Sequence, residues 1–183
     1  MFYRPIDEHL ALRLFSPFDA EEAYALIDAN RERLGEFLVW VSGVTSVEDE
    51  RQHLSDNAYD PDRKIKTFLT LDGAIIGAVG LIRINRVVRW AEIGYWIGAG
   101  YEGRGYVTAA VRELEKMCFT ELGMQRVQIR NDVDNLRSRA VPERLGYNLD
   151  GVLRRHALSG DGRIVDYSMY SLLREEWEAR EGH

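Results

Sequence analysis

A glycine-rich loop is the part of this sequence whose residue types point most directly to chemistry. Four glycines fall within eight positions, with one arginine among them: Gly98, Gly100, Gly103, Arg104 and Gly105. A hydrophobic pattern with helical spacing begins directly behind the loop. Backbone N–H groups at the start of a helix, the helix dipole and an arginine together attract phosphate. The loop therefore predicts an anion site, against the alternative that its glycines only form a tight turn.

Two common phosphate-binding motifs do not account for this loop. Gly98, Gly100 and Gly103 spell G-x-G-x-x-G, but the loop follows about ninety residues of helical and antiparallel pattern, and too little chain remains for a Rossmann sheet. A Walker A motif requires Gly-Lys-Ser/Thr where this chain has Arg104-Gly105. The anion site must therefore belong to another architecture.

The elements before the loop follow from hydrophobic periodicity. Strands are predicted at 10–15, 67–71, 74–84 and 90–97, and the turn signal Asp72-Gly73 joins the second and third into a hairpin. Two helices separate the first strand from the rest. Asp19 with Glu22 predicts a capping box for one of them, and the segment 45–48 predicts the start of the other.

The elements that follow the loop add one parallel strand to the otherwise antiparallel pattern. Apolar residues recur at helical spacing from Val107 to Leu122, and Gly123 is placed to end that helix. A short strand at 126–130 follows, so the strand-helix-strand order implies a parallel crossover. A helix at about 135–145 and a closing hairpin of 149–158 with 163–173 complete an α+β pattern.

Size and composition exclude several classes of protein. The chain has 183 residues, with 24 Lys+Arg against 30 Asp+Glu for a net charge of −6, and it is expected to form one domain. A lone Cys118 and four scattered histidines predict neither a disulfide nor a metal site. The acidic balance argues against nucleic-acid or anionic-membrane binding, and no apolar run approaches the ~20 residues of a spanning helix. We expect a cytoplasmic protein.

Several motifs, in order along the chain, resemble the GNAT acetyltransferases, and within them the branch of ribosomal-protein N-terminal acetyltransferases (RimJ/RimL-like). The motifs are AEIGYWI at 91–97, EGRG at 102–105, Asn135-x-x-Ser138 and PERLGY at 142–147. The similarity covers nearly the whole chain and implies a single acetyltransferase domain at 1–183. Its fold would be a mixed, mostly antiparallel twisted sheet, splayed between the fourth and fifth strands (90–97 and 126–130), with helices on both faces.

The resemblance implies that acetyl-CoA, as co-substrate, lies in the gap between those strands with its pyrophosphate on the amides of 102–108. Glu102 departs from the family pattern, because a carboxylate repels pyrophosphate unless it pairs with a nearby arginine. Arg137, with Arg139 and Arg144, forms a local positive cluster, of which at least one member is expected to be only structural. The residues expected to bind acetyl-CoA are Trp96, Ile97, Gly98, Glu102, Gly103, Arg104, Gly105, Tyr106, Val107, Thr108, Asn131, Asn135 and Arg137.

Two side chains are candidates for the chemistry that the resemblance implies. Glu92 shares a strand face with Trp96 and could take the proton of an acceptor amine through water; the alternative is an ordinary carboxylate on a polar face. Many GNAT enzymes place a thiolate-protonating Tyr where this chain has Pro142, so the prediction moves one helical turn earlier, to Ser138. Pro142 also frees the carbonyl of residue 138. Tyr147 is a backup donor, although core packing is its ordinary role.

The acceptor is the least determined part of this interpretation. Phe37, Trp40 and Tyr95 are candidates for its pocket, although aromatic residues at helical spacing usually belong to a core. The resemblance implies an N-acetyltransferase that acts on a primary amine, foremost a ribosomal-protein-like N-terminus, and homodimers are common in that branch. The alternatives are acetylation of a polyamine or aminoglycoside, and a non-catalytic module that binds acyl-CoA or a nucleotide.

Overall fold

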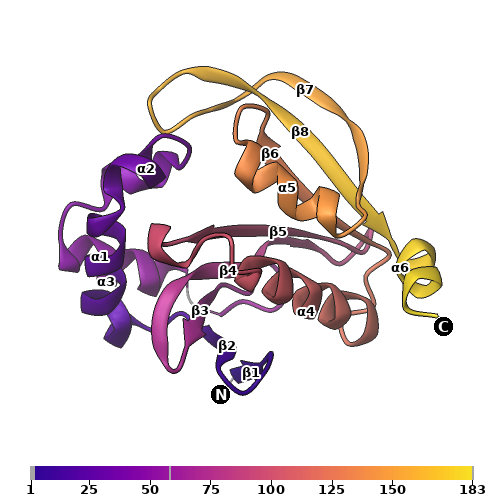
Figure 1. Ribbon diagram of the computed structural model, residues 1–183, viewed down its shortest axis with the longest axis horizontal. Helices are drawn as coiled ribbons and strands as arrows, with labels where there is room; N and C mark the ends of the chain where they lie inside the picture. The colour runs from indigo at the N-terminus through magenta and orange to yellow at the C-terminus, as the bar shows by residue number, and fades with distance from the viewer. Residues whose placement is uncertain (1–2, 58, 183) are drawn as a thin grey trace.

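One eight-stranded sheet forms the centre of the molecule. The computed structural model describes residues 3–57 and 59–182, and its strand order is β1-β2-β3-β4-β5-β6-β8-β7 (Figure 1). Neighbouring strands are antiparallel except β5 and β6, which are parallel. The strands are β1 (Tyr3–Pro5), β2 (Leu10–Leu14), β3 (Thr67–Leu71), β4 (Ala74–Asn85), β5 (Trp90–Ile97), β6 (Arg126–Asp132), β7 (Asn148–Leu158) and β8 (Ile164–Leu173).

Helices cover both faces of the sheet, as the sequence predicts. One face packs against α4 through buried residues such as Val111 and Leu114, and the other packs against α1 and α3 through Ala23 and Leu54. Because α4 is the longest element with a regular apolar stripe, its burial anchors the loop that precedes it. The α-helices are α1 (Ala20–Ala29), α2 (Arg31–Gly35), α3 (Val47–Asp56), α4 (Tyr106–Thr120), α5 (Leu136–Arg144) and α6 (Arg174–Glu181).

The sheet splits between β5 and β6. These strands pair only at their beginnings, where Trp90–Glu92 lies beside Arg126–Gln128. Farther along, β5 stays with β4 as far as Ile97, whereas β6 stays with β8. The predicted splay is therefore confirmed, and it opens a fork whose free edges carry unpaired backbone groups.

The start of the first long helix differs from its prediction. Asp19 occupies the N-cap of α1, but its side chain makes no capping hydrogen bond. Its carboxylate instead accepts from Arg13 Nη1 at 2.7 Å, and Glu22 accepts from the Ile75 N–H at 2.6 Å. The predicted capping box is wrong because both carboxylates bind neighbouring strands, which ties α1 to the sheet.

The remaining helix boundaries follow local chemistry. Ser46 caps α3 by accepting from the Asp49 N–H at 3.1 Å, within the predicted start at 45–48. Gly123 lies beyond the end of α4 with a φ of +66°, as expected of a residue that ends a helix. The helical spacing that begins near Asp19 continues to Leu34, so the sequence predicts one helix where the structure has α1 and α2, and it does not predict α6. Among the described residues, no helix combines the length and apolar character needed to cross a membrane.

Candidate active site

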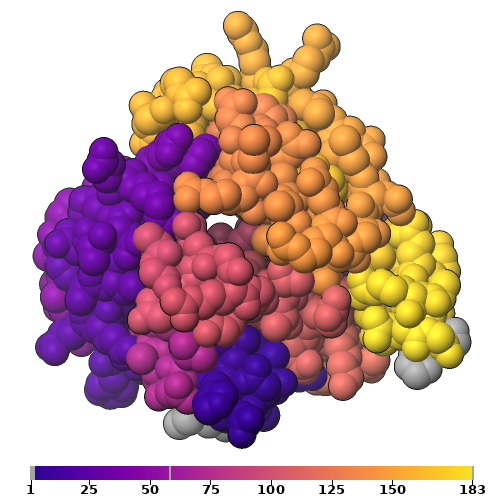
Figure 2. Space-filling model, viewed as in Figure 1, coloured from indigo at the N-terminus to yellow at the C-terminus, as the bar shows by residue number. Residues whose placement is uncertain are grey.

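The glycine loop lies at the open end of the fork and leaves backbone N–H groups exposed. Gly105 is the N-cap of α4 with a φ of +81° and has no side chain to cap the helix. The first bond into the helix is donated by the Ala109 N–H to the Gly105 carbonyl, so the N–H groups of Tyr106–Thr108 are available to a ligand. The side chains of Tyr106 and Val107 pack against the core. Figure 2 shows an opening between the region of residue 100 and α5.

The carboxylate of Glu102 bridges two arginines across this opening. Arg33 Nη1, from α2, lies 2.5 Å from one oxygen, and Arg137 Nη1, from α5, lies 3.1 Å from the other. This pairing answers the objection that a carboxylate would repel an anionic ligand here. Arg104 has no ion pair or side-chain hydrogen bond within the described part of the chain, so it remains available to an anion.

Two residues of the α1–α2 junction, which the sequence interpretation missed, fix the end of β5. Arg33 donates to the Ile97 carbonyl, and Asn30 Oδ1 accepts from the Ala99 N–H at 2.8 Å. The contacts span more than sixty residues of sequence, so no local pattern could reveal them. They hold the glycine loop in place from the acceptor side of the sheet.

Backbone donors of β5 face the fork. The Gly98 N–H donates to the Ile76 carbonyl of β4 at 2.9 Å. Because N–H groups alternate sides along a strand, those of Tyr95 and Ile97 point away from β4, toward the edge that β6 has left. Of the three residues at which the sequence interpretation expects a backbone donor for a carbonyl oxygen, Ile97 therefore turns its N–H toward the fork, whereas the N–H groups of Trp96 and Gly98 face β4.

Nearly every polar group of Ser138 is already bonded. Its N–H donates to Asn135 Oδ1 at 3.1 Å, its carbonyl accepts from the Tyr95 hydroxyl at 2.7 Å, and its Oγ accepts from Asn131 Nδ2 at 2.6 Å. Asn131 Nδ2 also donates to the Tyr95 oxygen at 3.3 Å. The Tyr95 proton is committed to Ser138, so the Asn131 group that faces both oxygens must be its amide nitrogen. What remains is the hydroxyl proton of Ser138.

Pro142 explains why Tyr95 can make this contact. Pro142 lies inside α5 and has no N–H for the carbonyl four residues earlier, which is that of Ser138. The Tyr95 hydroxyl takes that place, and burial raises the pKa of Tyr95 to about 12, so the hydroxyl keeps its proton at neutral pH. The sequence interpretation did not foresee this contact, and the place of Tyr95 in the acceptor pocket stays a prediction. Tyr95 and Trp96 point to opposite faces of β5, and Tyr95 supports Ser138.

The two asparagines of the fork differ in whether their side-chain oxygens have hydrogen-bond partners. Asn135 is the N-cap of α5, and its side-chain oxygen is used by the Ser138 N–H. The side-chain oxygen of Asn131 is buried and has no hydrogen-bond partner within the described residues. An acceptor left unpaired in this way costs stability unless a ligand N–H meets it. The amides of a pantetheine arm fit that requirement, so Asn131 fits a coenzyme A molecule in the fork.

Glu92 lies at the point where β5 and β6 part. It is buried, with 2% of its surface exposed, and its Oε1 accepts from Arg130 Nε at 2.8 Å while Oε2 accepts from Gln128 Nε2 at 3.2 Å. Arg130 Nη1 also lies 2.8 Å from His156 Nε2, which must be the acceptor because a guanidinium only donates. Glu92 and Ser138 therefore approach the fork from opposite sides of β5.

An aromatic cluster lies on the Glu92 side of β5. The ring centres of Trp40 and Trp96 are 6.1 Å apart, those of Trp40 and His53 are 5.3 Å apart, and His53 Nδ1 lies 3.1 Å from the buried carboxylate of Glu50. Trp40 thus reaches the predicted acceptor face. Phe37 is partly buried and makes no ring contact with this cluster among the described residues. The Glu50–His53 pair was not foreseen, because its spacing is that of any helical ion pair.

The hairpin of β7 and β8 closes the same side from above (Figure 1). Ser159 Oγ donates to the Glu36 carbonyl at 2.6 Å. A Cβ on Gly160 would lie 1.9 Å from the Gly35 carbonyl oxygen, so only glycine permits this approach. The contact joins the hairpin to the end of α2 and forms an arch over the acceptor face.

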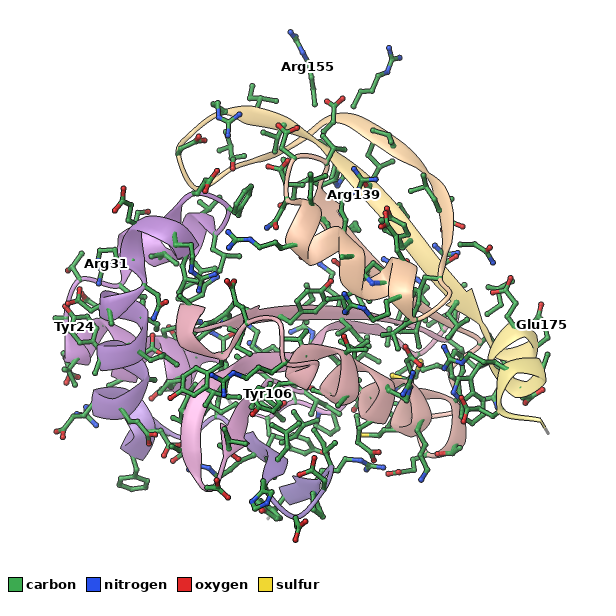
Figure 3. All side chains as sticks on the ribbon, in the orientation of Figure 1. Tyr24, Arg31, Tyr106, Arg139, Arg155 and Glu175 are labelled. Carbon is green, nitrogen blue, oxygen red and sulfur yellow. The ribbon has the colours of Figure 1, made fainter. Side chains whose placement is uncertain are left out.

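The two arginines that accompany Arg137 are structural in this molecule. Arg139, labelled in Figure 3, donates to the Tyr170 hydroxyl and to the Val133 carbonyl. Arg144 donates to Thr108 Oγ1 at 3.0 Å and so joins α5 to α4. Arg137 is thus the member of the cluster that faces the opening.

Comparison with known proteins places this geometry in a family. Residues 9–148 match the family model described as an acetyltransferase (GNAT) domain. The chain is 39% identical to "Putative ribosomal N-acetyltransferase YdaF" of Bacillus subtilis (strain 168), over 97% of this chain and 98% of that protein. It is 29% identical to the ribosomal-protein-serine acetyltransferase of Escherichia coli (strain K12), over 91% and 93% of the two chains.

A solved structure gives the same answer from the fold. The microcin C7 self-immunity acetyltransferase MccE, in complex with acetyl-CoA and AMP, superimposes with a TM-score of 0.86 at 28% identity, covering 92% of this chain and 94% of that one. The forked sheet, the uncapped helix start and the family match over most of the chain lead to one conclusion. This protein belongs to the GNAT acetyltransferase family.

Proposed function

We propose that this protein uses acetyl-CoA to acetylate the N-terminal amine of a polypeptide by direct transfer. The observation that carries the proposal is the hydrogen-bonding state of Ser138, whose hydroxyl proton alone is uncommitted, beside a fork lined with free β5 N–H groups. That arrangement suits a thioester, since it offers donors both for the carbonyl oxygen and for the departing sulfur. The names of the two bacterial relatives support a ribosomal-protein target.

The residues divide the reaction between the two sides of β5. The N–H groups of Tyr106–Thr108, with Arg104 and Arg137, hold the pyrophosphate and adenosine phosphates, and the Asn131 oxygen accepts from the pantetheine arm. The β5 N–H groups toward the fork polarise the thioester carbonyl. Acetyl-CoA supplies the activated acetyl group, and binding it beside the amine removes the entropic cost of their encounter.

Proton movement assigns roles to the two candidate side chains. Glu92 takes the proton of the amine, through water, as the nitrogen forms its bond to the acetyl carbon. The carbon–sulfur bond then breaks, and Ser138 donates a hydrogen bond to the thiolate that leaves. A thiolate with a pKa near ~8.5 needs only this help, because it is already a tolerable leaving group. Tyr95 and Asn131 hold Ser138 in the orientation that directs its proton outward.

Two measurements on one sample test this function. Acetyl-CoA should raise the thermal midpoint, and NAD should not. Free thiol should then be released only when an amine is present. Release should be faster with peptides that carry a free N-terminus than with spermidine or an aminoglycoside. Thermal stabilisation without thiol release from any amine would indicate a binding module, and turnover restricted to spermidine or the aminoglycoside would replace the polypeptide with a small cationic acceptor.

A further inference from the structure

A second hollow lies on the Glu92 side of the sheet, beside the beginning of β5. Its volume is about 610 Å³, and it is lined by the last residue of α3, the segment after α3, β4 and the first residue of β5. The residues that matter for its chemistry are Asp56, Asp60, Arg63, Lys64, Arg83 and Trp90.

A bulge in β4 turns Arg83 toward this groove. The register with β5 shifts between Leu81 and Arg83, so that two residues of β4 stand opposite Glu92. A bulge of this kind re-aims a side chain that alternation would send to the other face. Ile82 is 39% exposed and packs over Gly94, where a Cβ would lie 2.9 Å from it. Ile82 and Gly94 thus form a floor between the groove and the fork.

Most of the charges in the groove are already engaged. Lys64 Nζ donates to the Asp56 carbonyl at 2.9 Å and to Asn57 Oδ1 at 3.1 Å. The Asp56 carboxylate accepts from Gln52 Nε2 at 2.8 Å, and the Asp60 carboxylate accepts from the N–H of Asp62 at 3.2 Å. Each carboxylate thus has a neutral N–H partner, and the three cations of the groove outnumber its two carboxylates.

Two cations remain. Among the described residues, the guanidinium groups of Arg63 and Arg83 have neither an ion pair nor a hydrogen bond. They come from neighbouring segments, because the Ile84 N–H donates to the Arg63 carbonyl at 2.8 Å. Trp90 lies on the same groove, two residues before Glu92 on the same face of β5. The groove therefore offers an anion two unpaired arginines and an aromatic surface.

We infer that this groove binds a carboxylate side chain of the acceptor polypeptide, a few residues beyond the amine. The inference rests on the proposed function. From Tyr95, beside Ser138, to Trp90 is five residues of strand, or about 17 Å, which an extended peptide covers with roughly five residues. An Asp or Glu near positions 3 to 6 of the acceptor reaches Arg63 and Arg83. A polyamine, which carries only positive charge, is repelled there.

The test compares two peptides that differ only in acidic or neutral residues at positions 3 to 6. For the wild-type enzyme, KM for the acidic peptide should be lower, and the double variant Arg63→Gln/Arg83→Gln should raise it about 3- to 10-fold. KM for the neutral peptide and for acetyl-CoA should not change. Arg155→Gln is the matched control, because Arg155 is exposed and projects away from the molecule in Figure 3.

Direct binding separates this inference from the proposed function. Calorimetric titration of the same peptides into coenzyme A-loaded enzyme should show the same preference, which rising salt should weaken. Equal affinity of the wild type and the double variant for the acidic peptide overturns the inference, as does failure of the acidic peptide to bind. Preferential binding without turnover upholds the groove while the proposed function fails.

Discussion

The hydroxyl of Ser138 is a weak acid, but its proton is free to meet a ligand because the other polar groups of the residue already have hydrogen-bond partners. Asn135, Tyr95 and Asn131 take its N–H, its carbonyl and a lone pair of its hydroxyl oxygen. The proton left over has few places to go other than the open fork. The family resemblance led to Ser138, because Pro142, one helical turn later, cannot donate a proton. The contact of Tyr95 joins residues 43 apart in sequence and needed the structure.

Replacing Ser138 with Ala should lower kcat about 10- to 100-fold, the worth of one hydrogen bond to a charged group, with little change in KM for acetyl-CoA. Tyr95→Phe should give a smaller loss, because it misplaces the hydroxyl without removing it. Steady-state kinetics with both substrates varied makes the measurement. Unchanged turnover in Ser138→Ala would remove this residue from the mechanism.

Glu92→Gln should lower kcat/KM for the peptide about 100-fold in steady-state assays, because the amide cannot accept the amine proton. Glu50→Gln provides the matched control, since Glu50 is equally buried and hydrogen-bonded but lies on α3 beside His53. Unchanged kcat/KM in Glu92→Gln together with a large loss in Glu50→Gln would assign the base to the Glu50–His53 pair.

At the scale of elements, the sequence predicts the strands and helices with a strong hydrophobic period, but not the short helix α2 or the contacts it makes with distant residues. The β3–β4 hairpin, β5 and α4 lie where their patterns place them, because each has a regular apolar face. The five-residue α2 has too few turns to show a period. Its importance comes from Arg33, which binds Ile97 and Glu102 from the far side of the loop. The loop was predicted, whereas its support was not.

Glu102→Gln should bind acetyl-CoA about 3-fold more tightly at low salt. The change removes a negative charge from the phosphate site and frees Arg33 and Arg137 to meet the ligand. Calorimetry at two salt concentrations measures the effect. Glu121→Gln, which also breaks an ion pair but at the other end of α4, should leave affinity unchanged. Weaker binding by Glu102→Gln would mean that the carboxylate mainly organises its arginines.

For the whole molecule, buried tyrosines predict a loss of stability at alkaline pH. Burial raises the pKa of Tyr95 to about 12 and also raises the pKa values of Tyr147, Tyr167 and Tyr170. Tyrosines in the unfolded chain have a pKa of about 10. The raised pKa values of the folded state therefore add fully to the free energy of unfolding below pH ~10, and this contribution is lost as the pH rises toward 12. For Tyr95 alone it amounts to about 2 to 3 kcal/mol.

Urea unfolding at a series of pH values from 8 to 11 checks this expectation. The midpoint should hold steady to about pH 9 and then fall, and Tyr95→Phe should fall less steeply because it lacks one of the groups. A midpoint that stays level to pH 11 would show that these hydroxyls ionise as readily in the folded protein as in the unfolded chain.

The architecture as a whole could be predicted because its motifs occur in order along one chain, whereas the acceptor could not. The forked sheet and the glycine loop are built from continuous segments, but the acceptor face joins α2, α3, β4, β5 and the β7–β8 arch. Such a surface exists only after folding. Of the aromatic residues chosen by type, Trp40 stacks near Trp96 and Tyr95 contacts Ser138, and the roles of Phe37 and Tyr95 toward an acceptor stay predictions.

The central claim is transfer of an acetyl group to a polypeptide N-terminus, and tandem mass spectrometry of a peptide product tests it most directly. The peptide should carry a free α-amine, an internal lysine and an acidic residue near position 4. We predict one acetyl group, on the α-amine, formed only with acetyl-CoA and much more slowly by Ser138→Ala. Acetylation of the lysine alone, or an unmodified peptide under conditions where spermidine is acetylated, would contradict the claim.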